Sequence, residues 1–306
     1  MRNFLSVSDL SRGELAEILD RASILKEETR RGQWRTELQG RTVALLFQKP
    51  SLRTRVSFEQ GVRQLGGHAI YLSPAEVGLG ERESVPDVAR VLSRYVDCLV
   101  ARTYRHADLE VLARYATVPV VNALSDLSHP CQCLADLLTI REKKGGLAGL
   151  TMAYIGDGNN VLHSLILGSA KVGMHLRVAS PQGYGPRPDV VAAAGEDRSA
   201  TGASLSLVES PQEAAEGADI LYTDVWTSMG QEHEAEARRR SFEGYRVDAA
   251  LLRLARSDAI VMHDLPAHRG EEITDEVIDG PQSVVFDQAE NRLHAQKGLL
   301  SWLFAV

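Results

Sequence analysis

The sequence has few cysteines, and this limits how the protein can be held together. Its 306 residues include only Cys98, Cys131 and Cys133. Three cysteines cannot supply a disulfide framework, and free cysteines are typical of a reducing cytoplasm. Cys131 and Cys133 lack the partners and the spacing of a zinc site. We therefore expect no bound metal and expect both to be small buried residues near a helix start.

Two further absences exclude classes of protein. No segment approaches the run of about 20 apolar residues that crosses a membrane. Residues 1–6 hold no apolar run of the kind that a signal peptide needs. The net charge is −7, so nonspecific binding of nucleic acid is not expected as a main function. We expect a cytoplasmic protein without nucleic-acid or membrane partners.

What the chain does contain is a repeated alternation of strand-like and helix-like segments. The capping-box pattern Ser11-Arg12-Gly13-Glu14 predicts the first helix. Repeated βα alternation predicts an α/β fold of parallel sheets flanked by helices. The runs expected to form strands are 42–47, 69–72, 98–101, 118–123, 152–155, 176–179, 205–208, 220–222, 260–262 and 284–286.

The glycine-rich stretch 143–149 is the best candidate for a domain boundary, because the βα pattern restarts after it. We expect a first domain over 1–145, completed by a C-terminal helix at 289–306, and a second over 146–288, with interdomain helices joining them. Ligands of parallel sheets bind beyond the carboxyl ends of the strands. The polar clusters of this chain fall at such places.

A polar loop, Lys49-Pro50-Ser51-Leu52-Arg53-Thr54-Arg55, separates the first expected strand from a helix predicted over 56–65. The unpaired N–H groups and the dipole of a helix start favour an anion. Arg53 and Arg55 add donor forks that suit phosphate or carboxylate. A solvated, charged helix start with Ser51 as N-cap explains the same residues. The loop alone leaves both interpretations open.

Two further polar groups follow later strands. Arg102 ends a strand and is either a second anion ligand or a surface charge. Ser128-His129-Pro130-Cys131-Gln132 lies between a strand and a helix. His129 and Gln132 suit a polarised carbonyl or an amide, whereas helix capping around Pro130 accounts for the same pattern.

Together, the S-x-R-T-R loop, Arg102 and the H-P-x-Q motif resemble the aspartate/ornithine carbamoyltransferase family over nearly the whole chain. The resemblance implies transfer of a carbamoyl group from carbamoyl phosphate to an amine, with no metal or organic cofactor. It implies that the first loop grips the phosphate, with Leu52 acting through its backbone, and that Arg102, His129 and Gln132 hold the carbamoyl group. The donor-binding residues that it implies are Ser51, Leu52, Arg53, Thr54, Arg102, His129, Pro130, Cys131, Gln132, Leu265 and Arg292.

The second half of the chain indicates the acceptor. Residues 156–160, Gly-Asp-Gly-Asn-Asn, superficially fit a dinucleotide fingerprint, but Val161 occupies the third glycine position and the next strand lacks the acidic ribose ligand. Residues 224–230, Asp-Val-Trp-Thr-Ser-Met-Gly, are similar to the D-x-W-x-S-M-G loop of the ornithine branch, in which Asp224 would pair with the α-ammonium. The ornithine ligands that the resemblance implies are Asn160, Asp224, Ser228, Met229 and Asp264.

His263-Asp264-Leu265-Pro266 is similar to the family's H-C-L-P, with Asp264 in place of the cysteine that contacts the reacting δ-amine. Leu265-Pro266 matches a cis peptide in the family. Asp264 either holds the δ-ammonium and accepts its proton or is a tolerated substitution. An aspartate with an ordinary pKa of about 3.9 is a weak base, so we expect lower activity or a more alkaline optimum than in an Asp264→Cys variant. The residues expected to be catalytic are Arg53, Arg102, His129, Gln132 and Asp264.

The resemblance thus implies carbamoyl transfer to the δ-amine of L-ornithine, giving L-citrulline and phosphate for arginine biosynthesis. It also implies a homotrimer with active sites at subunit interfaces. Gly78 stands near the place where many relatives carry a glutamine that reaches the neighbouring subunit. Two alternatives stay open. One is a carbamoyltransferase for another amine, such as putrescine or acetylornithine, and the other is a binding homologue impaired in catalysis by Asp264.

Overall fold

The computed structural model describes residues 2–228, 230 and 232–305, and the chain divides into two compact units. Unit 1 comprises Met1–Leu138 and Glu290–Val306, and unit 2 comprises Thr139–Ala289. Helix α6 (Pro130–Lys144) carries the chain from unit 1 into unit 2, and helix α14 (Val285–Phe304) carries it back. The expected boundary at 145–146 comes directly after α6. The resemblance implies that the first domain binds carbamoyl phosphate and the second binds ornithine, and this assignment stays a prediction.

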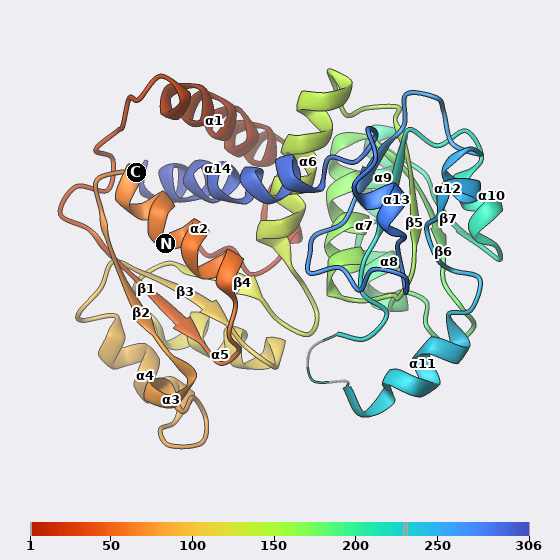
Figure 1. Ribbon diagram of the computed structural model, residues 1–306. Helices are drawn as coiled ribbons and strands as arrows, with labels where there is room; N and C mark the ends of the chain where they lie inside the picture. The colour runs from red at the N-terminus through yellow and green to blue at the C-terminus, as the bar shows by residue number, and fades with distance from the viewer. Residues whose placement is uncertain (1, 229, 231, 306) are drawn as a thin grey trace. The chain divides into compact units, whose positions relative to one another are not determined.

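Unit 1 is built on a four-stranded parallel sheet in the order β2-β1-β3-β4. Helices cover both faces of this sheet, with α2 and α14 on one side and α4 and α5 on the other (Figure 1). Its elements, besides the parts of α6 and α14, are η1 (Val7–Asp9), α1 (Arg12–Arg30), β1 (Thr42–Phe47), α2 (Leu52–Gln64), β2 (His68–Leu72), α3 (Pro74–Val77), α4 (Val85–Leu92), β3 (Cys98–Arg102), α5 (His106–Tyr115) and β4 (Val120–Leu124).

Unit 2 contains a five-stranded parallel sheet in the order β7-β6-β5-β8-β9. Residues of β5, β6, β8 and β9 share one apolar cluster with α10, α12 and α13. The elements of this unit are β5 (Thr151–Ile155), α7 (Asn160–Val172), β6 (His175–Ala179), α8 (Pro188–Ala193), α9 (Gly195–Thr201), β7 (Leu205–Val208), α10 (Pro211–Ala215), β8 (Ile220–Thr223), η2 (Glu232–Glu234), α11 (Ala235–Ser241), α12 (Ala249–Leu252), β9 (Ile260–Met262) and α13 (Asp275–Ile278).

The predicted fold class is confirmed, and several local predictions hold as well. Ser11 caps α1: its Oγ accepts a hydrogen bond from Glu14 N at 3.2 Å, and the Glu14 carboxylate accepts one from Ser11 N at 2.9 Å. Strand β1 is buried from Val43 to Phe47, as expected for a central strand covered on both faces. Among the described residues, no helix is both long and apolar enough to cross a membrane.

One predicted strand is wrong. Residues 284–286 were expected to form a strand, but helix α14 begins at Val285. Ser283 makes a single bridge to Val261 of β9, after which the chain turns into the helix. Val285 is buried and Phe286 is 67% exposed. A short apolar run does not distinguish a strand from the first turn of a helix, which explains the error.

Parallel pairing places the carboxyl ends of neighbouring strands at one edge of each sheet. In unit 1, β1, β3 and β4 run directly into the segments that hold Ser51, Arg102 and His129. In unit 2, β8 and β9 run into the segments that hold Asp224 and Asp264. Each unit therefore gathers its own set of candidate residues at one sheet edge.

Helices α1 and α14 lie side by side in unit 1 and approach closely at Gly298 (Figure 1). A Cβ atom at this position would lie 2.6 Å from the Ile18 carbonyl oxygen and 2.9 Å from the Ala22 Cβ. The first atom belongs to the backbone, so it cannot move aside without displacing α1. Gly298 thus fixes the distance between the two helices.

We expect Gly298→Ala to lower the free energy of unfolding by about 1–3 kcal/mol, the usual cost of overpacking a core. Gly13→Ala is the matched control, because a Cβ at Gly13 in α1 meets nothing within 4 Å. This control should be neutral or slightly stabilising, since alanine favours a helix by up to ~1 kcal/mol over glycine. Urea unfolding followed by circular dichroism measures both. Equal stability of the two variants would contradict the close approach.

Candidate functional site

The first turn of α2 is tied to the C-terminal helix of the same unit. Ser51 is the N-cap of α2, and its hydroxyl donates a hydrogen bond to Thr54 Oγ1 at 2.9 Å. Arg292 Nη2 of α14 donates to the same Thr54 oxygen at 2.7 Å. Thr54 is fully buried and Arg292 is 3% exposed. Ser51 therefore caps the start of α2, as one interpretation predicted. The Arg292 guanidinium also lies at this N-terminus.

Arg102 and His129 lie with Arg292 in a buried, positively charged cluster of unit 1. All three side chains are less than a tenth exposed. Burial lowers the pKa of His129 well below its usual value, and the positive charges of Arg292 and Arg102 lower it further. His129 is thus neutral near pH 7 and offers one N–H donor. Two guanidiniums beside a neutral imidazole suit an anion that also accepts a hydrogen bond.

Gln132 has its side-chain amide fixed by Asp136, one turn further along α6. Gln132 Nε2 donates to Asp136 Oδ1 at 2.8 Å, and both residues are fully buried. Among the described residues, Gln132 Oε1 has no hydrogen-bond partner. The amide therefore presents an oxygen, which suits an N–H group of a ligand.

Three residues of the segments expected to bind an anion have side chains that are engaged elsewhere, exposed or uncharged. Arg55 donates to Glu59 at 2.9 Å, and its guanidinium lies 3.8 Å from the centre of the Tyr71 ring. Leu52 is 76% exposed. Burial raises the pKa of the Cys131 thiol to about 12. Leu52 and Cys131 can therefore serve an anion through their backbones but not through an ionised side chain.

Gln48 and Lys49 directly follow β1 and were not among the residues predicted to bind a ligand, although Lys49 begins the polar loop described above. Gln48 Nε2 donates to the Leu79 carbonyl at 3.0 Å, and Gln48 Oε1 accepts from Tyr104 N at 2.9 Å. Lys49 is 7% exposed, and its ammonium lies 4.7 Å from the centre of the Tyr104 ring. Gln48 thus ties the loop at Leu79 to the end of β1. Position at a strand end was the signal that could have identified both.

Gly78 begins that loop in a backbone conformation that excludes a side chain. Its φ is +46°, and a Cβ atom would lie 2.7 Å from the Arg82 Cβ. A glutamine at this position would require a different loop. In this conformation, the loop therefore cannot present a glutamine side chain from position 78.

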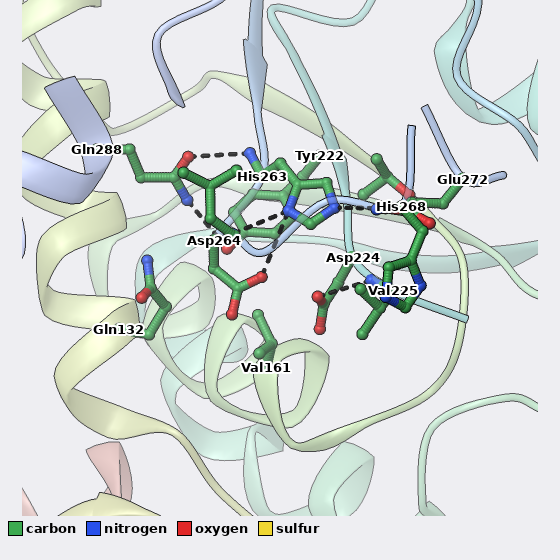
Figure 2. Close-up of polar contacts among 12 residues, drawn as sticks. Gln132, Val161, Tyr222, Asp224, Val225, His263, Asp264, His268, Glu272 and Gln288 are labelled. Atoms are coloured by element: carbon green, nitrogen blue, oxygen red, sulfur yellow. Dashed lines mark hydrogen bonds and ion pairs between the residues drawn. The ribbon is translucent and has the colours of Figure 1, made fainter. Parts of the chain in front are cut away.

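Unit 2 holds a second cluster around two carboxyl groups (Figure 2). Asp224 follows β8 and accepts hydrogen bonds from Asn159 Nδ2 at 2.6 Å and from Val225 N at 2.7 Å. Asp264 follows β9, and Figure 2 shows both carboxyl groups on the same side of the His263 ring. Burial raises the pKa of Asp224 well above its usual value, and the neighbouring Asp264 carboxyl raises it further.

His263 has its tautomer set by its hydrogen bonds. Leu265 N donates to His263 Nδ1 at 2.9 Å, so the ring proton lies on Nε2 and is donated to Glu272 Oε1 at 3.0 Å. Glu272 is fully buried and also accepts from His268 N at 2.6 Å. Both imidazole nitrogens are engaged, so the grouping of Asp224, His263 and Asp264 does not fit a metal ion. The Leu265-Pro266 peptide is cis, as predicted.

The other expected acceptor ligands are Asn160, Ser228 and Met229. Asn160 is the first residue of α7, and its neighbour Asn159 donates a hydrogen bond to Asp224. Ser228 is partly exposed in the segment after β8. Met229 lies outside the described residues. The roles of Asn160, Ser228 and Met229 stay predictions.

Arg238 of α11 is a further residue that the sequence did not indicate. Its guanidinium donates to the Trp226 carbonyl at 3.0 Å and pairs with Asp157 at 3.0 Å and Glu234 at 2.9 Å. Burial raises the pKa of Asp157 to about 6, although Arg238 opposes this. Arg238 thereby links Trp226, in the segment after β8, to Asp157, in the segment after β5.

Comparison with known proteins places these clusters in a family. Residues 2–142 match the family model described as the carbamoyl-P binding domain of aspartate/ornithine carbamoyltransferase, and residues 148–303 match its Asp/Orn binding domain. This chain belongs to the aspartate/ornithine carbamoyltransferase family. The predicted resemblance is confirmed.

Similar members of the family come from bacteria and archaea. The chain is 57% identical to the ornithine carbamoyltransferase of Acidothermus cellulolyticus, over 99% of this chain and 96% of that protein. The solved ornithine carbamoyltransferase of Pyrococcus furiosus has a TM-score of 0.97 and 51% identity, covering 99% of this chain and 97% of that one. A solved N-acetyl-L-ornithine transcarbamylase mutant is more distant, with a TM-score of 0.90 and 31% identity over 99% of this chain.

We expect Arg238→Met to destabilise unit 2 by about 3 kcal/mol at pH 8, because the variant leaves Asp157 as an unpaired buried carboxylate. The loss should be smaller at pH 5, where Asp157, with a pKa of about 6, is largely protonated in the native protein and attracts Arg238 less. Urea unfolding at the two pH values measures this difference. The double variant Arg238→Met/Asp157→Asn should recover part of the loss at pH 8, and a loss independent of pH would contradict the ion pair.

Proposed function

We propose that this protein is an ornithine carbamoyltransferase. It transfers the carbamoyl group of carbamoyl phosphate to the δ-amine of L-ornithine and forms L-citrulline and phosphate. The observation that carries the choice of acceptor is the pair of carboxyl groups of Asp224, which is buried, and Asp264, whose side chain is 11% exposed, in the Asp/Orn binding domain. Carboxyl groups suit the two ammonium groups of ornithine, whereas the second carboxylate of aspartate would be repelled.

Unit 1 binds the donor. The phosphate lies at the N-terminus of α2, where backbone N–H groups and the helix dipole favour an anion. Its ligands are Ser51, Leu52 through the backbone, Arg53 and Thr54. The hydrogen bond from Arg292 to Thr54 Oγ1, at 2.7 Å, supports this role because it brings a guanidinium to the same turn.

The carbamoyl group lies beside the buried cluster of Arg102, His129 and Gln132. Neutral His129 and the guanidiniums of Arg53 and Arg102 donate to the carbamoyl oxygen, on which negative charge develops as the amine attacks. Gln132 Oε1 accepts from the carbamoyl –NH₂, since the hydrogen bond from Gln132 Nε2 to Asp136 fixes the orientation of the amide. Pro130, Cys131 and the backbone of Leu265 complete the assigned donor ligands.

Unit 2 binds ornithine. Asp224 pairs with the α-ammonium and Asp264 faces the δ-amine, while Asn160, Ser228 and Met229 contact the amino acid. The hydrogen bond from Asn159 to Asp224 at 2.6 Å holds that carboxyl in place. Acetylornithine is a poorer acceptor in this scheme, because it has no α-ammonium for Asp224.

The protein is proposed to act in arginine biosynthesis in the cytoplasm, as a homotrimer. The relative from Pyrococcus furiosus, which is 52% identical over 98% of this chain, is named as an anabolic ornithine carbamoyltransferase and supports the biosynthetic direction. Size-exclusion chromatography with light scattering measures the assembly state.

The direct test is citrulline formation by the purified full-length protein from carbamoyl phosphate and ornithine. We expect product with ornithine and far less carbamoylation of putrescine, acetylornithine or aspartate at equal concentrations. Product from one of these amines but not from ornithine would correct the acceptor. No product from any of them, by a protein that still binds carbamoyl phosphate, would favour a binding homologue.

We expect Arg102→Met to lower kcat/KM for carbamoyl phosphate by roughly 100-fold or more, the usual loss when one donor to a developing oxyanion is removed. Arg63→Met is the matched control, because Arg63 lies on α2 with its guanidinium 4.9 Å from the centre of the Trp34 ring. This control should stay within about threefold of the unaltered protein, as expected for an exposed surface change. Steady-state kinetics at saturating ornithine compare the two. Equal losses of kcat/KM in the two variants would contradict the placement of Arg102 in the proposed site.

A further inference from the structure

Asn159 joins the ends of two neighbouring strands of unit 2. Strands β5 and β8 pair in parallel with Ile155 opposite Thr223, so the segments that follow them begin side by side. Asn159 follows β5, and its Nδ2 donates a hydrogen bond to Asp224 Oδ2, after β8, at 2.6 Å. Val225 N donates to the other carboxyl oxygen, Oδ1, at 2.7 Å (Figure 2). Both oxygens of Asp224 thus accept a hydrogen bond, which fixes the plane of its carboxyl group.

Helix α7 sets the orientation of the Asn159 amide. Asn159 is the N-cap of this helix, and its Oδ1 accepts hydrogen bonds from Val161 N at 3.0 Å and Leu162 N at 3.1 Å. The Tyr154 hydroxyl donates to the same oxygen at 3.3 Å. The two backbone N–H groups need an acceptor, so the amide cannot turn its nitrogen toward the helix without losing both bonds. The –NH₂ group is therefore held toward Asp224.

The glycine directly before Asn159 fixes the turn that presents it. A Cβ atom at Gly158 would lie 2.3 Å from both the carbonyl carbon and the carbonyl oxygen of Gly185. The backbone N of Gly158 also donates to the Tyr184 carbonyl at 2.7 Å. These neighbours are backbone atoms, which cannot move aside as the end of a flexible side chain can. The turn that superficially fits a dinucleotide fingerprint therefore serves close backbone packing, which places Asn159 at the start of α7.

We propose that Asn159 is a positioning residue that sets the preference of this site for an acceptor with a free α-ammonium. It holds the Asp224 carboxyl group in one orientation and favours its ionised form, which is the form that pairs with an ammonium. This inference rests on the proposed function, in which Asp224 pairs with the α-ammonium of ornithine, and it adds the residue that acts through Asp224.

The surroundings of Asp224 make this donor important. The residue is 5% exposed, and burial raises the pKa of its carboxyl group well above the usual value. A hydrogen bond donated to a carboxylate favours the charged form and opposes that shift. An acceptor whose α-nitrogen is acylated carries no charge there, so it gains nothing from an ionised Asp224. The contact from Asn159 therefore acts on the choice between the two kinds of acceptor.

The variant Asn159→Ser separates the two roles of this side chain. Serine is as good an N-cap as asparagine, so α7 stays capped, but serine lacks the –NH₂ group that donates to Asp224. Norvaline carries the α-ammonium of ornithine without its δ-amine. We expect its dissociation constant, measured by calorimetry with carbamoyl phosphate present, to rise about 10-fold, the usual worth of a hydrogen bond to a charged group. KM for ornithine should rise likewise and kcat should change less than about threefold, because the contact is made before and during the reaction alike.

A double-mutant cycle with Asp224→Asn tests whether Asn159 acts through Asp224. If it does, adding Asn159→Ser to Asp224→Asn changes kcat/KM for ornithine by less than about threefold. A merely structural role of Asn159 would instead give the same loss in both backgrounds. Ser210→Ala is the matched control, since Ser210 caps α10 in the same unit and accepts a hydrogen bond from Glu213 N at 3.1 Å. This control should leave kcat, KM and norvaline binding within about twofold of the unaltered protein, as expected for a change away from the site.

Three results would overturn the proposal: unchanged norvaline binding in Asn159→Ser, a fall in kcat with an unchanged KM, or equal losses in both backgrounds of the cycle. If Asn159→Ser fails to fold, Asn159→Gly replaces it in every measurement, because glycine is tolerated at an N-cap. No citrulline from an unaltered protein that binds norvaline would instead contradict the proposed function, and the binding measurements would still test the role of Asn159.

Discussion

Parallel strand pairing is the constraint on which the candidate site depends. Because every strand of a parallel sheet runs in the same direction, residues that follow different strands are delivered to one edge. In unit 1 this edge collects Arg102 and His129, and in unit 2 it collects Asp224 and Asp264. Residues far apart in sequence thus become neighbours without any long loop between them. The chemistry at each edge is then set by burial, which makes neighbouring charges interact strongly.

Burial shifts pKa values in opposite directions in the two clusters. In unit 1, burial and two guanidiniums hold His129 neutral, so a positively charged pocket still contains a neutral hydrogen-bond donor. In unit 2, burial and a second carboxyl group raise the pKa of Asp224 well above its usual value. One cluster suits a phosphorylated anion and the other a cationic amine. This division matches the two substrates of the proposed reaction.

Much of this organisation could be predicted from the sequence, because it depends on local patterns. Nine of the ten expected strands form, and the capping box at Ser11 forms as well. The partners of buried side chains could not be predicted in the same way. Arg238 meets Asp157 across 81 residues of sequence, and no spacing rule connects them.

The fixed amide of Gln132 bears on which small phosphorylated molecules the donor pocket accepts. The hydrogen bond from Gln132 Nε2 to Asp136 fixes the amide, so in the proposed scheme its oxygen faces the ligand and repels another oxygen. Acetyl phosphate offers a methyl group and carboxyphosphate offers a carboxylate where carbamoyl phosphate offers –NH₂. Either one leaves the Gln132 oxygen buried without a donor, at a cost of about 1–3 kcal/mol. In the proposed scheme, the orientation of one amide in α6 thereby favours carbamoyl phosphate over acetyl phosphate, which has the same charge and a similar size, and over carboxyphosphate, which carries an additional negative charge.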